Sequence, residues 1–279
     1  EFLAQMTDEE VAHLLGGQPN TGVANTFGWG NMPEYGIPNC MTADGPAGLR
    51  IAPECGVTTT AWPCATLLAA TWNPNVVYQV GAAGGKEVKE NNIAAWLTPA
   101  LNIHRSPLCG RNFEYYSEDP LLAGVLAGAM VKGIQSQGVA ATVKHFALNN
   151  KETDRKHSDS RVSERAAREI YLKAFEYVIK GAKPWAVMSS YNIINGCYAS
   201  ENKELLEDIL RDEWGFDGMV TTDWWTLGEH YKEVKAGNDM KMACGDPKRL
   251  KEAMDQGLLT RQDLEHCAER VLNLILKLD

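Results

Sequence analysis

The chain has 279 residues, of which 44% are hydrophobic and 23% are charged, so it can bury a full core and is neither disordered nor fibrous. A net charge of −9, without a basic stripe, argues against nucleic acid and anionic membranes as partners. No apolar stretch is long enough to span a bilayer and no secretion signal opens the sequence, so we expect a cytoplasmic protein without a membrane partner.

The seven cysteines are scattered and contain no CxxC pair, which favours free thiols in a reducing compartment over a disulfide framework. The six histidines show no spacing typical of metal ligands. We therefore expect no metal and no cofactor. Because the sequence starts at Glu1 without an initiator methionine, we expect either a processed chain or a fragment of a longer protein.

Helical and strand-like patterns alternate along the chain. Thr7 and Glu10 have the spacing of a helical capping box, and Pro74 is suited to the first turn of a helix. The expected helices cover 7–15, 74–92, 120–138, 163–182, 201–215, 247–256 and 261–278. The expected strands cover 94–103, 139–146, 185–192, 218–224 and 238–244.

Strands that are apolar along their whole length, each followed by a helix, indicate parallel βαβ units. For a chain of this size the pattern predicts an α/β fold, a single TIM-type (β/α)8 barrel domain over residues 1–279, irregular and with fewer than eight clear strands. An open doubly wound sheet is the alternative. No GxGxxG motif opens a helix after a strand, so nothing favours a dinucleotide site.

Chemically active side chains lie where the predicted strands end, and in a barrel these ends meet on one face. Each has a structural explanation when taken alone; Asp44, for example, precedes Gly-Pro and suits a turn. Together they predict an active site: Asp44, Arg111, Lys144, His145, Met188, Tyr191 and Asp223.

The residue types indicate a sugar. Carboxylate, guanidinium, ammonium and imidazole groups form many directional hydrogen bonds, which suits a polyhydroxylated ligand. Trp224, directly after Asp223, offers a flat apolar face for the C–H side of a pyranose ring.

Five segments resemble, in this order, the barrel domain of glycoside hydrolase family 3, in its β-glucosidase branch. They are DGPAGLR (44–50), CGRNFEYYSEDP (109–120), VKHFALNNKETDR (143–155), MSSYNIINGCYASEN (188–202) and GFDGMVTTDWW (215–225). The likeness extends over essentially the whole chain and is greatest to bacterial members whose two main domains occur in reversed order. It implies a retaining glycosidase that removes terminal β-D-glucosyl residues from β-glucosides or short β-gluco-oligosaccharides.

The resemblance also implies roles for individual residues. Asp223 matches the nucleophile, although Thr222 replaces the usual serine of the motif. Asp44 matches the carboxylate that holds hydroxyls at the far end of the glycone, and Glu114 matches an acid that orients Arg111. The other substrate-binding matches are Arg111, Lys144, His145 and Arg155 around the ring, Met188 and Tyr191 in the wall, and Trp224 beside the nucleophile. We expect the Arg and Lys charges to keep the pKa of Asp223 low.

A retaining mechanism needs a second carboxyl group about 5–5.5 Å from the nucleophile as acid/base. In two-domain relatives this group is a Glu on a separate α/β sandwich domain. Glu152, Glu201 and Glu229 are local candidates, but none lies in a motif of that kind. We therefore expect the acid/base on another domain or chain. A homo-oligomer is compatible with the sequence.

Three alternatives stay open. A branch of the family acts on β-N-acetylglucosaminides with a His-Asp dyad, for which His157 and Asp159 are the candidates, although their order and spacing differ. Lys144 at a strand end could instead form a Schiff base, as in aldolase-type barrels. The chain could also be a sugar-binding barrel without catalysis. The choice among glucose, xylose and galactose stays open as well.

Overall fold

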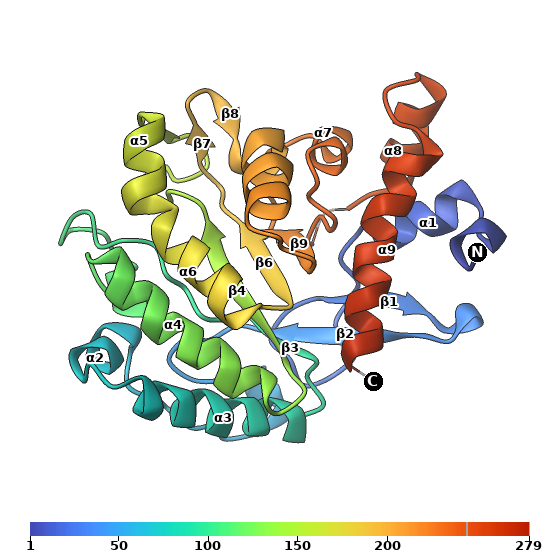
Figure 1. Cartoon of the computed structure of the whole chain (residues 1–279). Coiled ribbons are helices and arrows are strands. Elements are labelled where there is room, and N and C mark those ends of the chain that lie inside the picture. The colour runs from blue at the N-terminus through green and yellow to red at the C-terminus, as the bar shows by residue number, and fades with distance from the viewer. Residues whose placement is uncertain (244, 279) are drawn as a thin grey trace.

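The fold is organised around a six-stranded sheet, which the computed structural model describes within residues 1–243 and 245–278. The strands lie in the order β1–β2–β3–β4–β6–β9 (Figure 1). β1 is antiparallel to β2, and every other neighbouring pair in this sheet is parallel. The bounds are β1 Gly28–Met32, β2 Ile37–Ala43, β3 Ala95–Trp96, β4 Ala140–Phe146, β6 Ala186–Ser189 and β9 Met219–Thr222.

Two short segments close this sheet into a barrel. Met240 pairs with Thr221 of β9, the next residue Lys241 pairs with Gly16, and Gln18 pairs with Gly28 of β1. Each segment contributes isolated bridges rather than a regular strand. The predicted (β/α)8 barrel with fewer than eight clear strands is therefore confirmed.

The crossovers between parallel strands are helical. In Figure 1, α3, α4 and α6 lie over the outer face of the sheet, whereas α1, α8 and α9 lie together near both termini. The α-helices are α1 Asp8–Leu14, α2 Ala65–Ala70, α3 Pro74–Glu90, α4 Pro120–Gln135, α5 Glu164–Ala166, α6 Lys173–Ala182, α7 His230–Lys235, α8 Pro247–Asp255 and α9 Arg261–Leu278. Backbones of α3 and α4 touch: a Cβ added to Gly133 would lie 2.3 Å from the Tyr78 carbonyl oxygen, so only glycine fits.

The capping box expected at Thr7 and Glu10 is confirmed, and a second one lies near the other end of the chain. The Thr7 hydroxyl accepts a hydrogen bond from the Glu10 amide, and the Glu10 carboxylate accepts one from the Thr7 amide. Thr260 and Asp263 make the same reciprocal pair before α9. Such caps satisfy the amides that a helix start leaves unpaired.

Some expected elements differ in the structure. The strand expected over 94–103 is reduced to β3 and an isolated bridge between Ala100 and Lys144, and Pro99 between them has no amide proton for a ladder. The helix expected over 163–182 contains a π-helical stretch, Ala167–Tyr171, and most of the 201–215 helix is π-helical, Glu204–Glu213. The 238–244 strand contributes only the two bridges, and its last residue, Cys244, lies outside the described residues.

A small second sheet was not foreseen from the sequence. It has the order β5–β7–β8, with β5 Asp159–Ser160, β7 Ile193–Ile194 and β8 Cys197–Tyr198. Short 3-10 turns cover Leu3–Gln5, Pro33–Tyr35, Pro53–Cys55, Asn112–Glu114 and Ala199–Glu201.

The core has two layers, which explains why the strands are apolar along their whole length. Ala140, Ala186 and Met188 belong to one hydrophobic cluster, whereas Val143 and Val187 belong to another, which also contains residues of α3, α4 and α6. Because successive strand residues point to opposite faces, both faces need apolar side chains.

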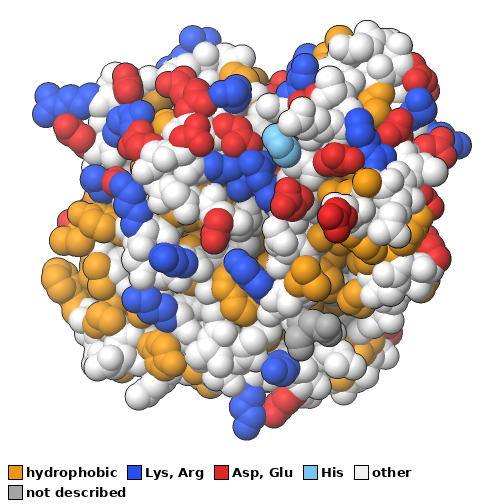
Figure 2. All heavy atoms as spheres, turned by 45° about the vertical axis from the view of Figure 1, so that its right-hand side comes forward, with side chains coloured by type: hydrophobic (Ala, Val, Ile, Leu, Met, Phe, Trp, Pro, Cys, Tyr) orange, Lys and Arg blue, Asp and Glu red, His pale blue; other side chains and the backbone are white. Residues whose placement is uncertain are grey.

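The surface carries charges of both signs. Acidic and basic side chains are interspersed on the face that Figure 2 shows. Within the described part of the chain, no helix has the length and apolar character that crossing a membrane requires.

Candidate active site

One pocket of about 390 Å³ lies at the C-terminal edge of the barrel strands. It contains all nine residues singled out from the sequence: Asp44, Arg111, Lys144, His145, Arg155, Met188, Tyr191, Asp223 and Trp224. Four further residues line it: Asn25, Thr26, Leu97 and Trp225. The structure therefore brings the predicted residues together, and their roles stay predictions.

The direction of β1 explains two of the lining residues that sequence reasoning missed. Because β1 is antiparallel to β2, its first residue, Gly28, lies opposite Met41 near the end of β2. Asn25 and Thr26, just before β1, therefore reach the same edge as Asp44. The Asn25 side-chain oxygen accepts a hydrogen bond of 3.0 Å from the Asp44 amide.

Asp223 directly follows β9, and its carboxylate is held at one oxygen and free at the other. Its amide donates to the Ser189 carbonyl, which fixes it against β6, and its Oδ1 accepts a 2.8 Å hydrogen bond from the Trp224 amide. Its Oδ2 is buried and has no hydrogen-bond partner among the described residues. An unpaired buried carboxylate oxygen that lines a pocket is available to react with a ligand.

The expectation of a low pKa for Asp223 is wrong. Burial raises the pKa of Asp223 above its usual value, although the charges of Lys144 and Arg111 act to lower it. The carboxylate lies too deep for the nearby cations to outweigh its desolvation.

His145 is fixed as a neutral hydrogen-bond acceptor facing the pocket. Burial, followed by the charges of Arg111 and Lys144, holds its pKa well below the usual value. Arg111 has only donors, so the 2.9 Å contact from its Nη2 assigns His145 Nε2 as the acceptor and places the proton on Nδ1, 3.2 Å from the Tyr115 hydroxyl. The His145 Nε2 lies 3.9 Å from the Asp223 Oδ2.

The backbone of His145 is locked by a residue that sequence reasoning missed. The Asn102 side chain accepts from the His145 amide and donates to the His145 carbonyl, both at 2.8 Å. Asn102 lies in the irregular segment after β3, and nothing in its spacing indicated this contact.

Asp44 forms a charged cluster with Lys144 and Arg50 at another wall of the pocket. Its Oδ1 accepts a 2.8 Å hydrogen bond from the buried Lys144 ammonium, and its Oδ2 lies 3.3 Å from Arg50. Burial acts to raise the pKa of Asp44, but the charges of Lys144 and Arg50 lower it to about 2. Asp44 is therefore an ionised acceptor. Arg50 lies within the DGPAGLR segment, and sequence reasoning did not select it.

The remaining cations are oriented by acidic and aromatic neighbours. Arg111 pairs with the buried Glu114, as the resemblance implied. Arg155 lies 4.5 Å above the Tyr191 ring, and the Tyr191 hydroxyl donates a 2.7 Å hydrogen bond to the Trp224 carbonyl. Cation–π contact and ion pairing thus hold these groups at the pocket wall.

A buried ion pair between Lys241 and Glu233 fixes the loop that follows Asp223. The Lys241 ammonium lies 2.7 Å from the Glu233 Oε2 and also donates to the Thr226 hydroxyl and the Gly228 carbonyl. The Glu233 Oε1 accepts hydrogen bonds from Thr226 and from Ser200. This network joins α7 to the segment that closes the barrel.

The three local candidates for a second carboxyl group do not line the pocket. Glu152 pairs with Arg155, Glu201 accepts from the Glu229 amide, and Glu229 pairs with Lys232. Among the described lining residues, Asp44 and Asp223 are the only carboxylates.

The alternative of a His157–Asp159 dyad gains no support from the contacts of these two residues. His157 contacts Asp154 at 2.8 Å, whereas Asp159 pairs with Arg161. Within residues 1–243 and 245–278, no group of three or more His, Cys, Asp or Glu side chains is placed to hold a metal ion.

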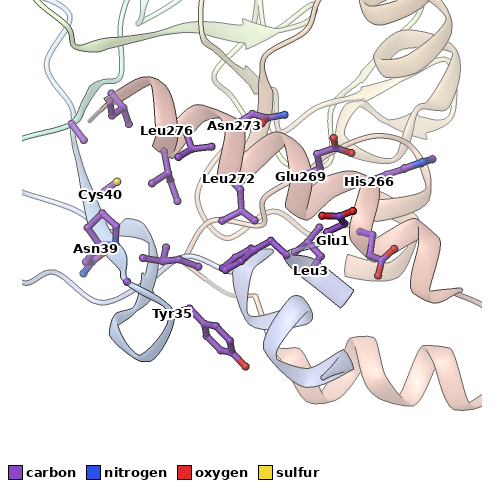
Figure 3. Close-up of a pocket in the computed structure, with 18 of the residues that line it drawn as sticks. Glu1, Leu3, Tyr35, Asn39, Cys40, His266, Glu269, Leu272, Asn273 and Leu276 are labelled. Carbon is purple, nitrogen blue, oxygen red and sulfur yellow. The ribbon is translucent and has the colours of Figure 1, made fainter. Parts of the chain in front are cut away.

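A larger cavity of about 1060 Å³ lies elsewhere, between α9, the first residues and the β1–β2 hairpin. Figure 3 shows Leu272 and Leu276 of α9 beside it, with Glu269 and His266 farther along the same helix. None of the nine residues predicted from the sequence lines this cavity. The smaller, charged pocket is therefore the candidate active site.

Comparison with known proteins identifies the family. The sequence pattern of the glycosyl hydrolase family 3 N terminal domain matches residues 31–274. The chain belongs to glycosyl hydrolase family 3. It is 66% identical over 265 residues to beta-glucosidase A of Butyrivibrio fibrisolvens, covering 95% of this chain and 32% of that protein.

Two further similar proteins show the range of the likeness. The exo-alpha-(1->6)-L-arabinopyranosidase of Bifidobacterium longum is 44% identical, over 98% of this chain and 36% of its own length. The structure of beta-glucosidase 3B from Thermotoga neapolitana in complex with alpha-D-glucose superposes with a TM-score of 0.95 at 43% identity, covering 99% of this chain and 42% of that one. The chain thus spans about a third of the length of these two relatives found by sequence.

Proposed function

We propose that this family 3 barrel is the nucleophile-bearing part of a retaining β-glucosidase that removes terminal β-D-glucosyl residues. The observation that carries the proposal is the Asp223 carboxylate, with one oxygen held by an amide and the other free in a pocket ringed by polar side chains. The names of the B. fibrisolvens and T. neapolitana relatives support the substrate class.

The charged walls bind the sugar ring. Asp44, ionised, accepts hydrogen bonds from glycone hydroxyls, while Lys144 and Arg111 donate to them. The imidazole of His145 is neutral and its Nε2 accepts a hydrogen bond from Arg111. It therefore adds no positive charge beside Asp223.

Asp223 performs the first displacement. Its Oδ2 attacks the anomeric carbon, a bond forms between that carbon and the carboxylate, and the bond to the leaving oxygen breaks. Water then attacks the same carbon from the opposite face and frees the carboxylate, so that the configuration is retained. Only the ionised form of Asp223 attacks. Burial works against ionisation by raising the pKa of Asp223, and the charges of Lys144 and Arg111 favour the reactive form because they act to lower it.

The acid/base belongs, in this proposal, to another domain or chain. Asp44 cannot protonate a leaving group near neutral pH, since its pKa is about 2 and it pairs with Lys144. The longer relatives have room for a further domain that would bring a carboxyl group over the pocket. Without it, we expect activated aryl glycosides, which need little protonation, to be the better substrates.

The test is turnover of 2,4-dinitrophenyl β-D-glucopyranoside, with NMR detection of the first anomer formed. The β-anomer should appear first, and Asp223→Asn should abolish turnover. Asp217→Asn is the matched control, since Asp217 is an exposed carboxylate just before the same strand. The α-anomer first, or equal activity in Asp223→Asn, would refute the proposal. The arabinopyranoside of the same leaving group, run in parallel, assigns the glycone.

A further inference from the structure

Two consecutive tryptophans line the pocket but differ in what they expose. Trp224 is 8% exposed and belongs to the same hydrophobic cluster as Met188, whereas Trp225 is 53% exposed. A large apolar ring left half open beside a polar pocket is a surface that a ligand can cover. Trp224 is therefore part of the wall, and Trp225 is the aromatic face that remains free.

The Trp225 ring is held in place rather than loose. It meets the half-buried Phe27 edge-on, with ring centroids 6.1 Å apart and an interplanar angle of 90°. Phe27 is itself tied to β2, because its carbonyl accepts hydrogen bonds from the amide and the hydroxyl of Thr42. Edge-to-face packing of this kind fixes the position of the exposed ring.

The Trp225 backbone is also fixed. Its amide donates to the Met242 carbonyl at 3.3 Å, and its carbonyl accepts a 2.9 Å hydrogen bond from the Lys156 ammonium. Its φ of +54° lies in the left-handed region, which bulky side chains rarely adopt. The surrounding contacts therefore impose an unfavourable backbone conformation that aims this side chain at the pocket.

We infer that Trp225, supported by Phe27, is the platform on which the aglycone rests, and that it selects flat leaving groups such as an aryl ring or a second pyranose. The inference depends on the proposed function. The leaving group is attached to the carbon that Asp223 attacks, so its binding surface lies near that carboxylate. Trp225 lies two residues beyond Asp223, which limits their Cα separation to about 7 Å. The polar groups, by contrast, suit the hydroxyls of the glycone.

The experiment compares two reagents that deposit the same 2-deoxy-2-fluoroglucosyl group on the enzyme. One is the 2,4-dinitrophenyl glycoside, whose leaving group is an aryl ring, and the other is the glycosyl fluoride, whose leaving group is a single atom. Neither needs a proton donor to depart. The rate of mass gain, measured over a range of reagent concentrations, gives the second-order rate constant of labelling.

Trp225→Asn should slow labelling by the aryl glycoside roughly three- to tenfold and leave labelling by the fluoride unchanged. Asparagine removes the ring and accepts the left-handed backbone. Trp225→Phe should restore most of the aryl rate. Trp72→Asn is the matched control: Trp72 has a φ of +53° and is 75% exposed, but it does not line the pocket.

Three results would overturn the inference. Equal slowing with both reagents would mean that Trp225 acts on the glycone, on the fold or in a contact with another domain. No slowing with either would mean that the ring touches no aglycone. Failure of the unmodified chain to label with both reagents would overturn the proposed function, and the platform with it.

Discussion

Removing the Lys241 ammonium should destabilise the barrel strongly, because it leaves the Glu233 carboxylate buried without its counter-ion. Glu233 has 0% of its surface exposed and would keep only the hydroxyls of Ser200 and Thr226. Breaking a buried pair from one side costs about 3–5 kcal/mol. At roughly 2–4 °C per kcal/mol for a domain of this size class, Lys241→Met should lower Tm by about 6–20 °C.

A second substitution separates the buried charge from the lost packing. Glu233→Gln keeps an oxygen that accepts from Ser200 and Thr226 but removes the charge, so the double variant should recover at least half of the lost stability. The assay is denaturant unfolding of each single variant and of the double variant. The control is Lys251→Met, which breaks an exposed pair with Asp255 and should cost less than about 1 kcal/mol. A loss below about 1 kcal/mol in Lys241→Met, or a double variant no better than the single, would refute this reasoning.

Three further predictions concern the pocket. Lys144→Met removes the charged hydrogen bond that Lys144 is proposed to donate to a glycone hydroxyl, and should lower kcat/KM for dinitrophenyl glucoside about 10- to 150-fold. A loss under threefold would contradict the role of Lys144 as a glycone ligand. Because burial raises the pKa of Asp223 and only its ionised form attacks, labelling should fall with decreasing pH at a higher pH than for an ordinary Asp, and Lys144→Met should move this fall higher still; a rate that stays flat through the acidic range would argue against it. Asn102→Ala unpairs the buried His145 backbone and should cost about 1–3 kcal/mol in urea unfolding as well as slow labelling, and unchanged stability would contradict that role.

The strand-end residues could be predicted because the physics that places them is local. A buried parallel strand shows as an apolar run, and the residue after it lies at the C-terminal edge. Asp44 after β2 and Asp223 after β9 follow this rule directly. The spacing of Thr7 and Glu10 likewise predicted the start of α1, because a capping box involves only residues that are close in sequence.

The features that the sequence did not reveal depend on contacts between distant segments. The antiparallel direction of β1 brings Asn25 and Thr26 to the pocket edge, and no periodicity in that segment indicates its direction. The pKa of Asp223 depends on whether desolvation outweighs the charges around it, which only three-dimensional burial determines. The different exposures of Trp224 and Trp225 also arise from packing, since the two residues are chemically identical.

The most direct test of the central claim is the intact mass of the chain after incubation with 2,4-dinitrophenyl 2-deoxy-2-fluoro-β-D-glucopyranoside, followed by peptide mapping. We expect one fluoroglucosyl group per chain, located on Asp223 and absent from Asp223→Asn. No mass gain in a folded chain, tested with any co-purifying partner present, or a label on another residue, would contradict the account.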